Sequence, residues 1–181
     1  MLFSRTKIPE VILIEIPKFD DDRGFFMETY HAKKFSDAGI KINFIQDNHS
    51  YSKKNILRGL HYQLKFPQGK LVRCTQGEIL DVAVDIRTSS PTFGEWVGEI
   101  LSSANAKQLY VPPGFAHGYV VRSEHAEVEY KCTELYHPED DYGIAWNDPD
   151  IGIDWKIENP ILSKKDKEQP LLRNVKEKLY K

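Results

Sequence analysis

The chain has 181 residues, of which 40% are hydrophobic and 29% are charged, a balance typical of a globular protein. The formal net charge is -2, so no bulk positive field favours a nucleic-acid partner. No apolar run approaches the roughly 20 residues of a membrane-spanning helix, and no secretory signal is recognisable. We therefore expect one cytoplasmic domain over residues 1–181, with its core at about residues 45–150 and no membrane partner.

The predicted elements are mostly short strands. A turn is expected at residues 20–24 and a helix at residues 31–39, with Phe35 and Ala38 facing inward. The tail, residues 158–181, is predicted to be irregular covering structure with one short terminal helix. Apolar or β-branched runs bounded by Gly, Pro, Asn or Ser predict strands over residues 11–16, 25–30, 70–74, 79–86, 96–101, 108–111, 118–122 and 128–135. Many short strands favour a β-sandwich or barrel.

Two features inside these strands concern the core. Asp81 and Asp85 alternate with valines, so the strand at residues 79–86 is expected to have one apolar face and one acidic face. Cys74 and Cys132 lie in separate strand-like segments without a further Cys or His at zinc-finger spacing. We interpret both as buried thiols.

The densest group of polar residues is Leu-Arg-Gly-Leu-His-Tyr-Gln at residues 57–63. On a regular strand Arg58 lies on one face, while His61 and Gln63 lie on the other. An interior lined by His and Gln is costly unless it holds water, a ligand or hydrogen-bond partners. Lys70 begins the next strand and is expected at the same cavity. A lone histidine is more often a core residue whose hydrogen bonds are satisfied. The nearby Arg58, Gln63 and Lys70 favour a functional site here.

A second group, Pro-x-Gly-x-x-His at residues 112–117, places His117 at a barrel mouth. This spacing resembles the second motif of the cupin superfamily. In metal-binding cupins that histidine joins two histidines and a glutamate, which begin in an earlier His-x-His segment. Here His61 is present, but position 63 is Gln, so a three-histidine site fails. The resemblance favours a mainly β, cupin-type jelly-roll barrel with a few short peripheral helices and no metal.

Two tyrosines form a third group of candidates. Tyr130 and Tyr136 are six residues apart, so both face the same side if one strand carries them. A buried tyrosine with a suitable partner can donate a proton, although plain aromatic packing is the simpler interpretation of either ring.

Candidate phosphate and nucleoside ligands form the fourth group. Arg23 and Arg58 match phosphate oxygens bidentately, and Gln46 and Asn48 alternate along a strand where they could read a base edge or ribose. Surface ion pairs and turns are the structural alternative for each. No Gly-x-Gly-x-x-Gly, Walker, Gly-x-Ser-x-Gly or Cys-x-x-Cys motif occurs, which argues against common oxidoreductases and hydrolases.

Taken in order, these motifs closely resemble the dTDP-4-dehydrorhamnose 3,5-epimerase family. The resemblance runs from about residue 8 to about residue 172. It is carried by residues 22–24, 46–50, 57–63, 68–73, 81–87, 90–94, 113–118, 130–133 and 146–149.

The resemblance implies a homodimeric jelly-roll enzyme that needs no cofactor and acts on a dTDP-linked 4-keto-6-deoxyhexose. It implies His61 as the base, paired with Asp166, Tyr130 as the opposing acid, and Lys70 beside the keto oxygen. Tyr136 matches a ring that stacks on the substrate. The other implied binding residues are Arg23, Glu28, Gln46, Asn48, Arg58, His117, Asp141 and Lys165. Asp141 stands where many members carry Glu, so its carboxylate is one methylene shorter.

Other functions stay open at this point. A metal-dependent cupin enzyme is disfavoured by Gln63, and a cupin that only binds sugars or nucleotides is disfavoured by His61, Lys70 and Tyr130 together. Within the epimerase interpretation, the sequence leaves open whether one carbon or both are inverted, and whether thymidine is preferred over uridine.

Overall fold

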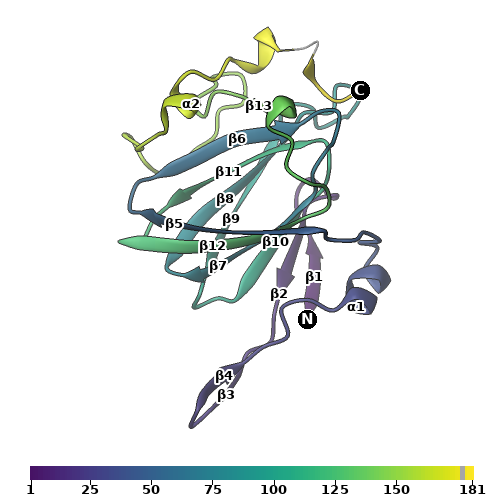
Figure 1. Cartoon of the computed structure of the whole chain (residues 1–181), viewed down its shortest axis with the longest axis vertical. Coiled ribbons are helices and arrows are strands. Elements are labelled where there is room, and N and C mark those ends of the chain that lie inside the picture. The colour runs from purple at the N-terminus through teal and green to yellow at the C-terminus, as the bar shows by residue number, and fades with distance from the viewer. Residues whose placement is uncertain (176–177) are drawn as a thin grey trace.

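The computed structural model describes residues 1–175 and 178–181 and consists mainly of two antiparallel sheets (Figure 1). The six-stranded sheet contains, in spatial order, β1 (Leu2–Arg5), β2 (Ile12–Glu15), β10 (Lys107–Val111), β7 (Lys70–Gln76), β12 (His125–Cys132) and β5 (Gln46–Lys53). The five-stranded sheet contains β13 (Asp141–Gly143), β6 (Leu57–Gln63), β11 (Phe115–Val121), β8 (Glu78–Asp85) and β9 (Trp96–Ser102).

The strand pairing identifies a jelly roll. Among strands β5 to β12, the first pairs with the last, β6 with β11, β7 with β10 and β8 with β9, as in one long hairpin folded over itself. The two sheets face each other around a shared core, in which Val72 and Leu109 of one sheet meet Ile79 and Phe115 of the other. The predicted mainly β, cupin-type jelly roll is therefore confirmed.

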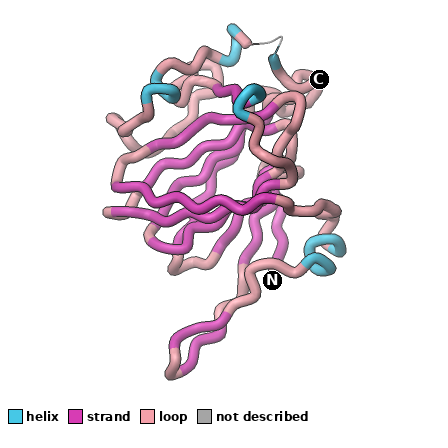
Figure 2. Tube along the Cα trace, viewed as in Figure 1, coloured by secondary structure: helices cyan, strands magenta, loops and turns pink. Residues whose placement is uncertain are grey.

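Segments from the two ends of the chain pack against parts of the two sheets (Figures 1 and 2). α1 (Ala32–Asp37) buries Phe35 against Ile14 and Tyr110 on the six-stranded sheet, as the predicted helix requires. The C-terminal segment packs Trp155 and Leu172 on the five-stranded sheet. This segment contains α2 (Lys164–Lys167) and the 3-10 turn η2 (Leu172–Asn174), and a further 3-10 turn, η1 (Pro138–Asp140), precedes β13.

An arm made of β3 (Phe19–Asp21) and β4 (Gly24–Phe26) projects away from the two sheets (Figures 1 and 2). Three aromatic side chains on it, Phe19, Phe25 and Phe26, are 61%, 57% and 71% exposed. Exposed aromatic residues gathered on one projecting element mark an interaction surface more often than a free surface.

Several predicted boundaries were wrong. The predicted strand at residues 25–30 ends at Phe26, and the one at residues 128–135 ends at Cys132, where the ladder to β5 and β7 stops. β1, β3 and β13 were not predicted, and part of β3 lies in the turn expected at residues 20–24. Where one short terminal helix was expected, the tail contains α2 and the 3-10 turn η2, and residues 176–177 lie outside the described part of the chain.

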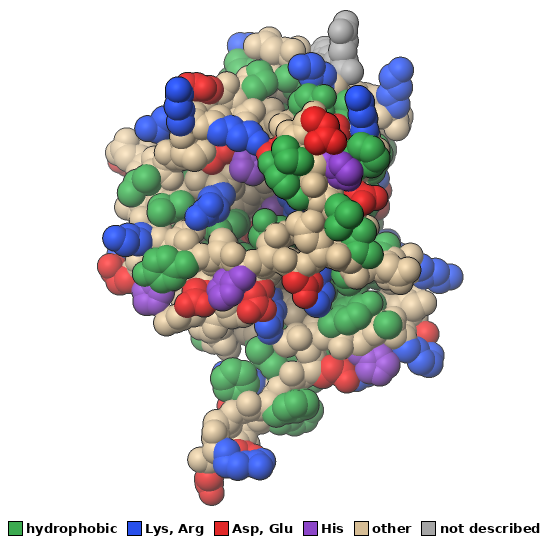
Figure 3. All heavy atoms as spheres, viewed as in Figure 1, with side chains coloured by type: hydrophobic (Ala, Val, Ile, Leu, Met, Phe, Trp, Pro, Cys, Tyr) green, Lys and Arg blue, Asp and Glu red, His purple; other side chains and the backbone are tan. Residues whose placement is uncertain are grey.

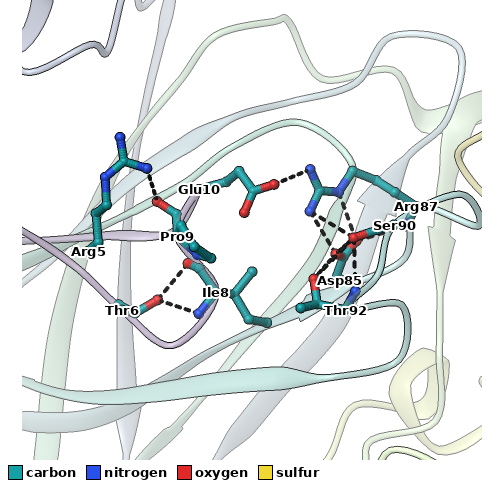
Figure 4. A network of polar contacts seen from close by, with 9 residues as sticks. All are labelled: Arg5, Thr6, Ile8, Pro9, Glu10, Asp85, Arg87, Ser90 and Thr92. Atoms are coloured by element: carbon teal, nitrogen blue, oxygen red, sulfur yellow. Dashed lines mark hydrogen bonds and ion pairs between the residues drawn. The ribbon is translucent and has the colours of Figure 1, made fainter.

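Asp85, on the acidic face of β8, is held by specific hydrogen-bond partners. Asp85 is buried and accepts hydrogen bonds from Arg87 Nη2 at 2.7 Å, Ser90 Oγ at 2.6 Å and Thr92 Oγ1 at 2.7 Å, while Glu10 holds Arg87 from the N-terminal loop at 2.9 Å (Figure 4). Burial raises the pKa of Asp85, but these hydrogen bonds outweigh it and leave the pKa below its ordinary value. The network fixes the loop after β8.

Cys74 and Cys132 are free and buried, as predicted. Within the residues that the structure describes, no helix is long and apolar enough to cross a membrane.

Candidate active site

A cavity of about 460 Å³ opens between the two sheets and is closed on one side by the C-terminal segment. Figure 3 shows histidine, lysine and arginine side chains beside a hollow in the upper half of this face. The lining comes from β5, β6, β7, β11 and β12 and from residues 161–166. Of the sequence-predicted site residues, it contains Arg58, His61, Lys70, His117, Tyr130, Lys165 and Asp166.

His61 and Asp166 form a hydrogen-bonded dyad at this cavity. His61 Nε2 lies 2.6 Å from Asp166 Oδ1, and the carboxylate is nearly buried. Ser163 caps α2 by accepting a hydrogen bond from the Asp166 backbone N–H at 3.0 Å, which fixes the carboxylate in the first turn of that helix. Burial raises the pKa of Asp166, but the hydrogen bond from His61 and its charge outweigh this, so the pKa lies below its ordinary value.

The dyad leaves one imidazole nitrogen available. Because Nε2 is engaged by the carboxylate, Nδ1 is the atom that can accept a proton. A carboxylate at this distance fixes the tautomer and stabilises the imidazolium that proton transfer creates.

Lys70 and Tyr130 face the same cavity from neighbouring strands of the six-stranded sheet, β7 and β12. Burial lowers the pKa of the Lys70 ammonium, and the nearby Cys132, Asp141 and Asp81 counteract this shift. Burial also raises the pKa of the Tyr130 hydroxyl to about 12. Tyr130 is therefore a protonated donor near neutral pH, and the Lys70 amine is held in a poorly solvated place with acidic groups nearby.

Arg58 lies on the cavity side together with His61, contrary to the prediction that they face opposite ways. Between β6 and β11, His61 is opposite His117 but Arg58 is opposite Tyr119, so three steps along β6 match two along β11. This bulge at Gly59 reverses the alternation of side chains. The Arg58 guanidinium donates from Nε to Ser52 Oγ at 3.0 Å.

His117 lies at the floor of the cavity, next to His61 on the adjacent strand. Its Nε2 is 2.8 Å from Oδ1 of Asp81, and both side chains are buried. The second oxygen of Asp81 has no hydrogen-bond partner among the described residues. The acidic face predicted for β8 thus supplies a partner for a cavity histidine.

A second set of predicted residues meets at the rim. The Tyr136 hydroxyl donates to Asp141 Oδ2 at 2.9 Å, and Lys165 forms an ion pair with the same carboxylate. The Tyr136 backbone N–H donates to Gln46 Oε1 at 2.8 Å. Tyr136 lies beyond the end of β12, so the prediction that it shares a strand face with Tyr130 was wrong. We call Gln46, Tyr136, Asp141 and Lys165 the rim cluster.

Two further predicted residues have local roles in this structure. Asn48 accepts from Gln46 Nε2 at 3.2 Å and contacts Cys132 Sγ at 3.5 Å, so the alternation of Gln46 and Asn48 on β5 is confirmed. Gln63 does not line the cavity, although the sequence placed it beside His61 on an interior face. Its amide is occupied by backbone groups of neighbouring loops.

Arg23 and Glu28 are separate from the cavity of their own chain. Arg23 lies at the tip of the arm, is almost fully exposed and bonds to Asp21, with Nη2 and Oδ2 2.5 Å apart. Glu28 follows the arm and pairs with Lys34 at 2.7 Å. The structure therefore does not bring these two residues together with the other predicted ligands.

Sequence reasoning assigned no role to Ser50 or Tyr119. Ser50 Oγ and Tyr119 Oη are 2.8 Å apart across the cavity wall, and both line it. The signal was available for Tyr119, since it lies two residues after His117 on β11 and so faces the same side. Among the residues that the structure describes, no three His, Cys, Asp or Glu side chains are placed to hold a metal ion.

Comparisons with known proteins show the family of this chain. A family model described as dTDP-4-dehydrorhamnose 3,5-epimerase matches residues 5–174. The enzyme of that name from Pseudomonas aeruginosa is 54% identical over 170 residues, covering 93% of this chain and 94% of the relative. A dTDP-4-dehydrorhamnose 3-epimerase from Streptomyces niveus is 35% identical over 159 residues, covering 87% and 77%.

A solved structure is also similar to this chain. The crystal structure of a dTDP-6-deoxy-D-glucose-3,5-epimerase from Legionella pneumophila, in complex with dTDP-4-keto-L-rhamnose, superposes with a TM-score of 0.97 at 48% identity. The match covers 99% of this chain and 97% of that one. With the family model spanning nearly the whole jelly roll and its cavity, this chain belongs to the dTDP-4-dehydrorhamnose 3,5-epimerase family.

Proposed function

We propose that this protein inverts carbons 3 and 5 of dTDP-4-keto-6-deoxy-D-glucose through enolates and so forms dTDP-4-keto-L-rhamnose for dTDP-L-rhamnose biosynthesis. The observation that carries the proposal is one cavity that holds the His61–Asp166 dyad together with Lys70 and Tyr130. Both carbons flank the ketone at carbon 4, so the same chemistry serves twice and no redox cofactor is needed.

His61 is the base in this mechanism. A proton next to a ketone is weakly acidic, so its removal needs a base in contact with it. Nδ1 of His61 takes the proton, while Asp166 at 2.6 Å from Nε2 stabilises the imidazolium.

Lys70 stabilises the enolate. Negative charge develops on the carbon 4 oxygen as the proton leaves, and a preorganised cationic donor is worth roughly 3 kcal/mol at such an atom. Burial at the cavity makes the Lys70 ammonium poorly solvated, while Asp81 and Asp141 oppose the resulting fall in its pKa and favour the charged form.

Tyr130 returns a proton to the opposite face of the sugar ring. Its hydroxyl, with a pKa of about 12, is protonated under ordinary conditions and is a stronger acid than the carbon it serves. The tyrosine comes from the six-stranded sheet and His61 from the five-stranded sheet, which supports their action on opposite faces of a substrate between them.

The remaining candidates bind the nucleotide sugar. Arg58, His117 and Lys165 supply positive or hydrogen-bonding groups at the cavity for the diphosphate, and Tyr136 offers a stacking surface at the rim. Gln46, Asn48 and Asp141 are assigned to the nucleoside end. This set does not choose between thymidine and uridine.

Arg23 and Glu28 bind substrate in this proposal only if the arm reaches a second copy of the chain. The arm is too remote from its own cavity, and its exposed Phe25 and Phe26 suit burial against another subunit. We therefore include a cytoplasmic homodimer in the proposal, in which each arm completes the other subunit's site. The two reduced, buried cysteines are compatible with that compartment.

Inversion of carbon 3 alone is the second candidate, because a 35% identical relative is named a 3-epimerase. Proton NMR of dTDP-4-keto-6-deoxyglucose with the protein in deuterated water separates the two. We expect deuterium at carbons 3 and 5 and a product inverted at both. Deuterium and inversion at carbon 3 only would establish the monoepimerase, and no exchange at either carbon would contradict the proposed function.

A further inference from the structure

The amide of Gln63 is fully used by backbone groups near the rim. Gln63 is 6% exposed at the end of β6, and its Nε2 donates to Phe66 O at 2.6 Å and to Leu135 O at 3.1 Å. Its Oε1 accepts from the His137 N–H at 2.8 Å. A buried amide without partners would cost free energy, so these contacts hold the side chain and the loops to one another.

The residue between Leu135 and His137 is Tyr136, the aromatic member of the rim cluster. Gln63 therefore fixes the peptide groups on both sides of Tyr136, and Gln46 fixes the Tyr136 N–H itself at 2.8 Å. The two glutamines come from different sheets, Gln46 from β5 and Gln63 from β6. The backbone of Tyr136 is thus clamped across the mouth of the barrel.

This clamp replaces the order that a strand would provide. β12 ends at Cys132, so Tyr136 lies outside the strand ladder, and the residue is 52% exposed. An exposed ring on an irregular segment would ordinarily lose conformational freedom when a ligand stacks on it. A segment that is fixed beforehand avoids most of that loss.

We propose that Gln63 is a positioning residue that preorganises Tyr136 for the nucleotide-linked sugar and thereby sets substrate affinity. The inference rests on the proposed function, in which Tyr136 stacks on the substrate. It also explains why glutamine stands at position 63, where metal-binding cupins carry histidine. A neutral imidazole has one donor and one acceptor, so it cannot donate to two carbonyls and accept from an N–H at once.

Gln63→Met tests the proposal, because methionine keeps the volume and removes all three hydrogen bonds. We expect KM to rise on the order of tenfold, while kcat and deuterium exchange at the reacting carbons stay within about twofold. Gln63→Glu, which keeps only the acceptor for His137, should raise KM as well and serves if the methionine variant folds poorly. An unchanged KM in a folded variant would overturn the proposal.

Asn105→Leu is the matched control. Asn105 also makes three backbone hydrogen bonds, to Ser102, Lys107 and Ile100, but it braces the turn between β9 and β10, away from the cavity. Its loss should lower Tm and leave KM unchanged. A KM increase in this variant would show that general destabilisation, rather than the clamp, causes the effect.

A double-mutant cycle with Tyr136→Ala separates the inference from the proposed function. If Gln63 acts through Tyr136, Gln63→Met should add little to the KM of Tyr136→Ala. Full additivity of the two effects would contradict the clamp. If Tyr136→Ala alone leaves KM unchanged, the stacking role in the proposed function fails instead.

Discussion

His61 owes its reactivity to a neighbour that is remote in the sequence. Asp166 lies 105 positions later, on α2, and reaches the imidazole because the C-terminal segment folds back over β6. Lys70 and Tyr130 also depend on the fold. Their altered pKa values come mainly from burial between two sheets. Residue types and motif spacing could identify the candidates. Their electrostatic states could not be predicted, because they depend on packing.

Tyr130→Phe tests the acid on the second face of the sugar. Without the hydroxyl, the enolate can still regain a proton from the His61 side, which exchanges with solvent. We expect inversion to slow by about 10²–10⁴-fold, the usual contribution of a general acid, while deuterium exchange slows much less. The two rates are measured together by proton NMR in deuterated water.

Tyr110→Phe is the control for that substitution. Tyr110 is also buried, with a pKa raised by burial to about 12, but it packs in the core beneath α1 and not at the cavity. Its loss should leave both rates unchanged. Equal losses of inversion and exchange in Tyr130→Phe would remove Tyr130 as the acid.

At the scale of elements, β6 shows where the rule that side chains alternate between the two faces of a strand fails. The alternation rule separates Arg58 from His61, but the bulge at Gly59 puts both on the cavity side. A Cβ at Gly59 would lie 2.5 Å from the Gly118 Cα, and Gly59 has φ +130°, so only glycine permits this close approach. Gly59 within the strand indicated a bulge, but the effect of the bulge on the direction of the side chains depends on the facing strand.

The loop after β8 gives a stability prediction. Asp85→Ala should lower the free energy of unfolding by about 3–5 kcal/mol, because it leaves the buried end of Arg87 without its main partner. The pKa of Asp85 is depressed in the folded state. Its stabilisation is therefore present above the unfolded-state pKa of about 4 and is lost as pH falls through the folded value.

Urea unfolding of both proteins at several pH values measures this effect. The difference between wild type and Asp85→Ala should be largest near neutral pH and shrink on acidification. Glu10→Gln, which changes the half-exposed partner of the same arginine, should cost only about 0–1 kcal/mol. A difference that grew as pH fell would refute the assigned role of the ionised carboxylate.

For the whole molecule, the jelly roll could be predicted from strand patterning and the cupin-like motifs, since eight strands that bury one face have few ways to close. The direction of the arm could not be predicted. Its exposed Phe19, Phe25 and Phe26 carry no information on where they dock until a second surface is known. The sequence grouped Arg23 with Arg58 because it shows the chemistry of each residue but not which subunit contributes that residue to a site.

The proposed homodimer is tested by mixing two defective variants. Arg23→Ala should raise KM, and His61→Ala should be inactive. In a mixed dimer, the intact cavity of one subunit meets the intact arm of the other, so activity with a low KM should return to a fraction of the sites. Analytical ultracentrifugation confirms that the variants assemble. No recovery in a mixture shown to contain mixed dimers would contradict sharing of the arm.

The central claim is that His61 removes the proton next to the ketone. The most direct measurement is deuterium incorporation at carbons 3 and 5 of dTDP-4-keto-6-deoxyglucose with His61→Ala in deuterated water. His125→Ala, which alters a partly buried histidine stacked on Tyr51, is the control and should exchange normally. We predict that His61→Ala abolishes enzyme-dependent exchange at both carbons while the protein stays folded. Exchange at the wild-type rate in folded His61→Ala would contradict this account.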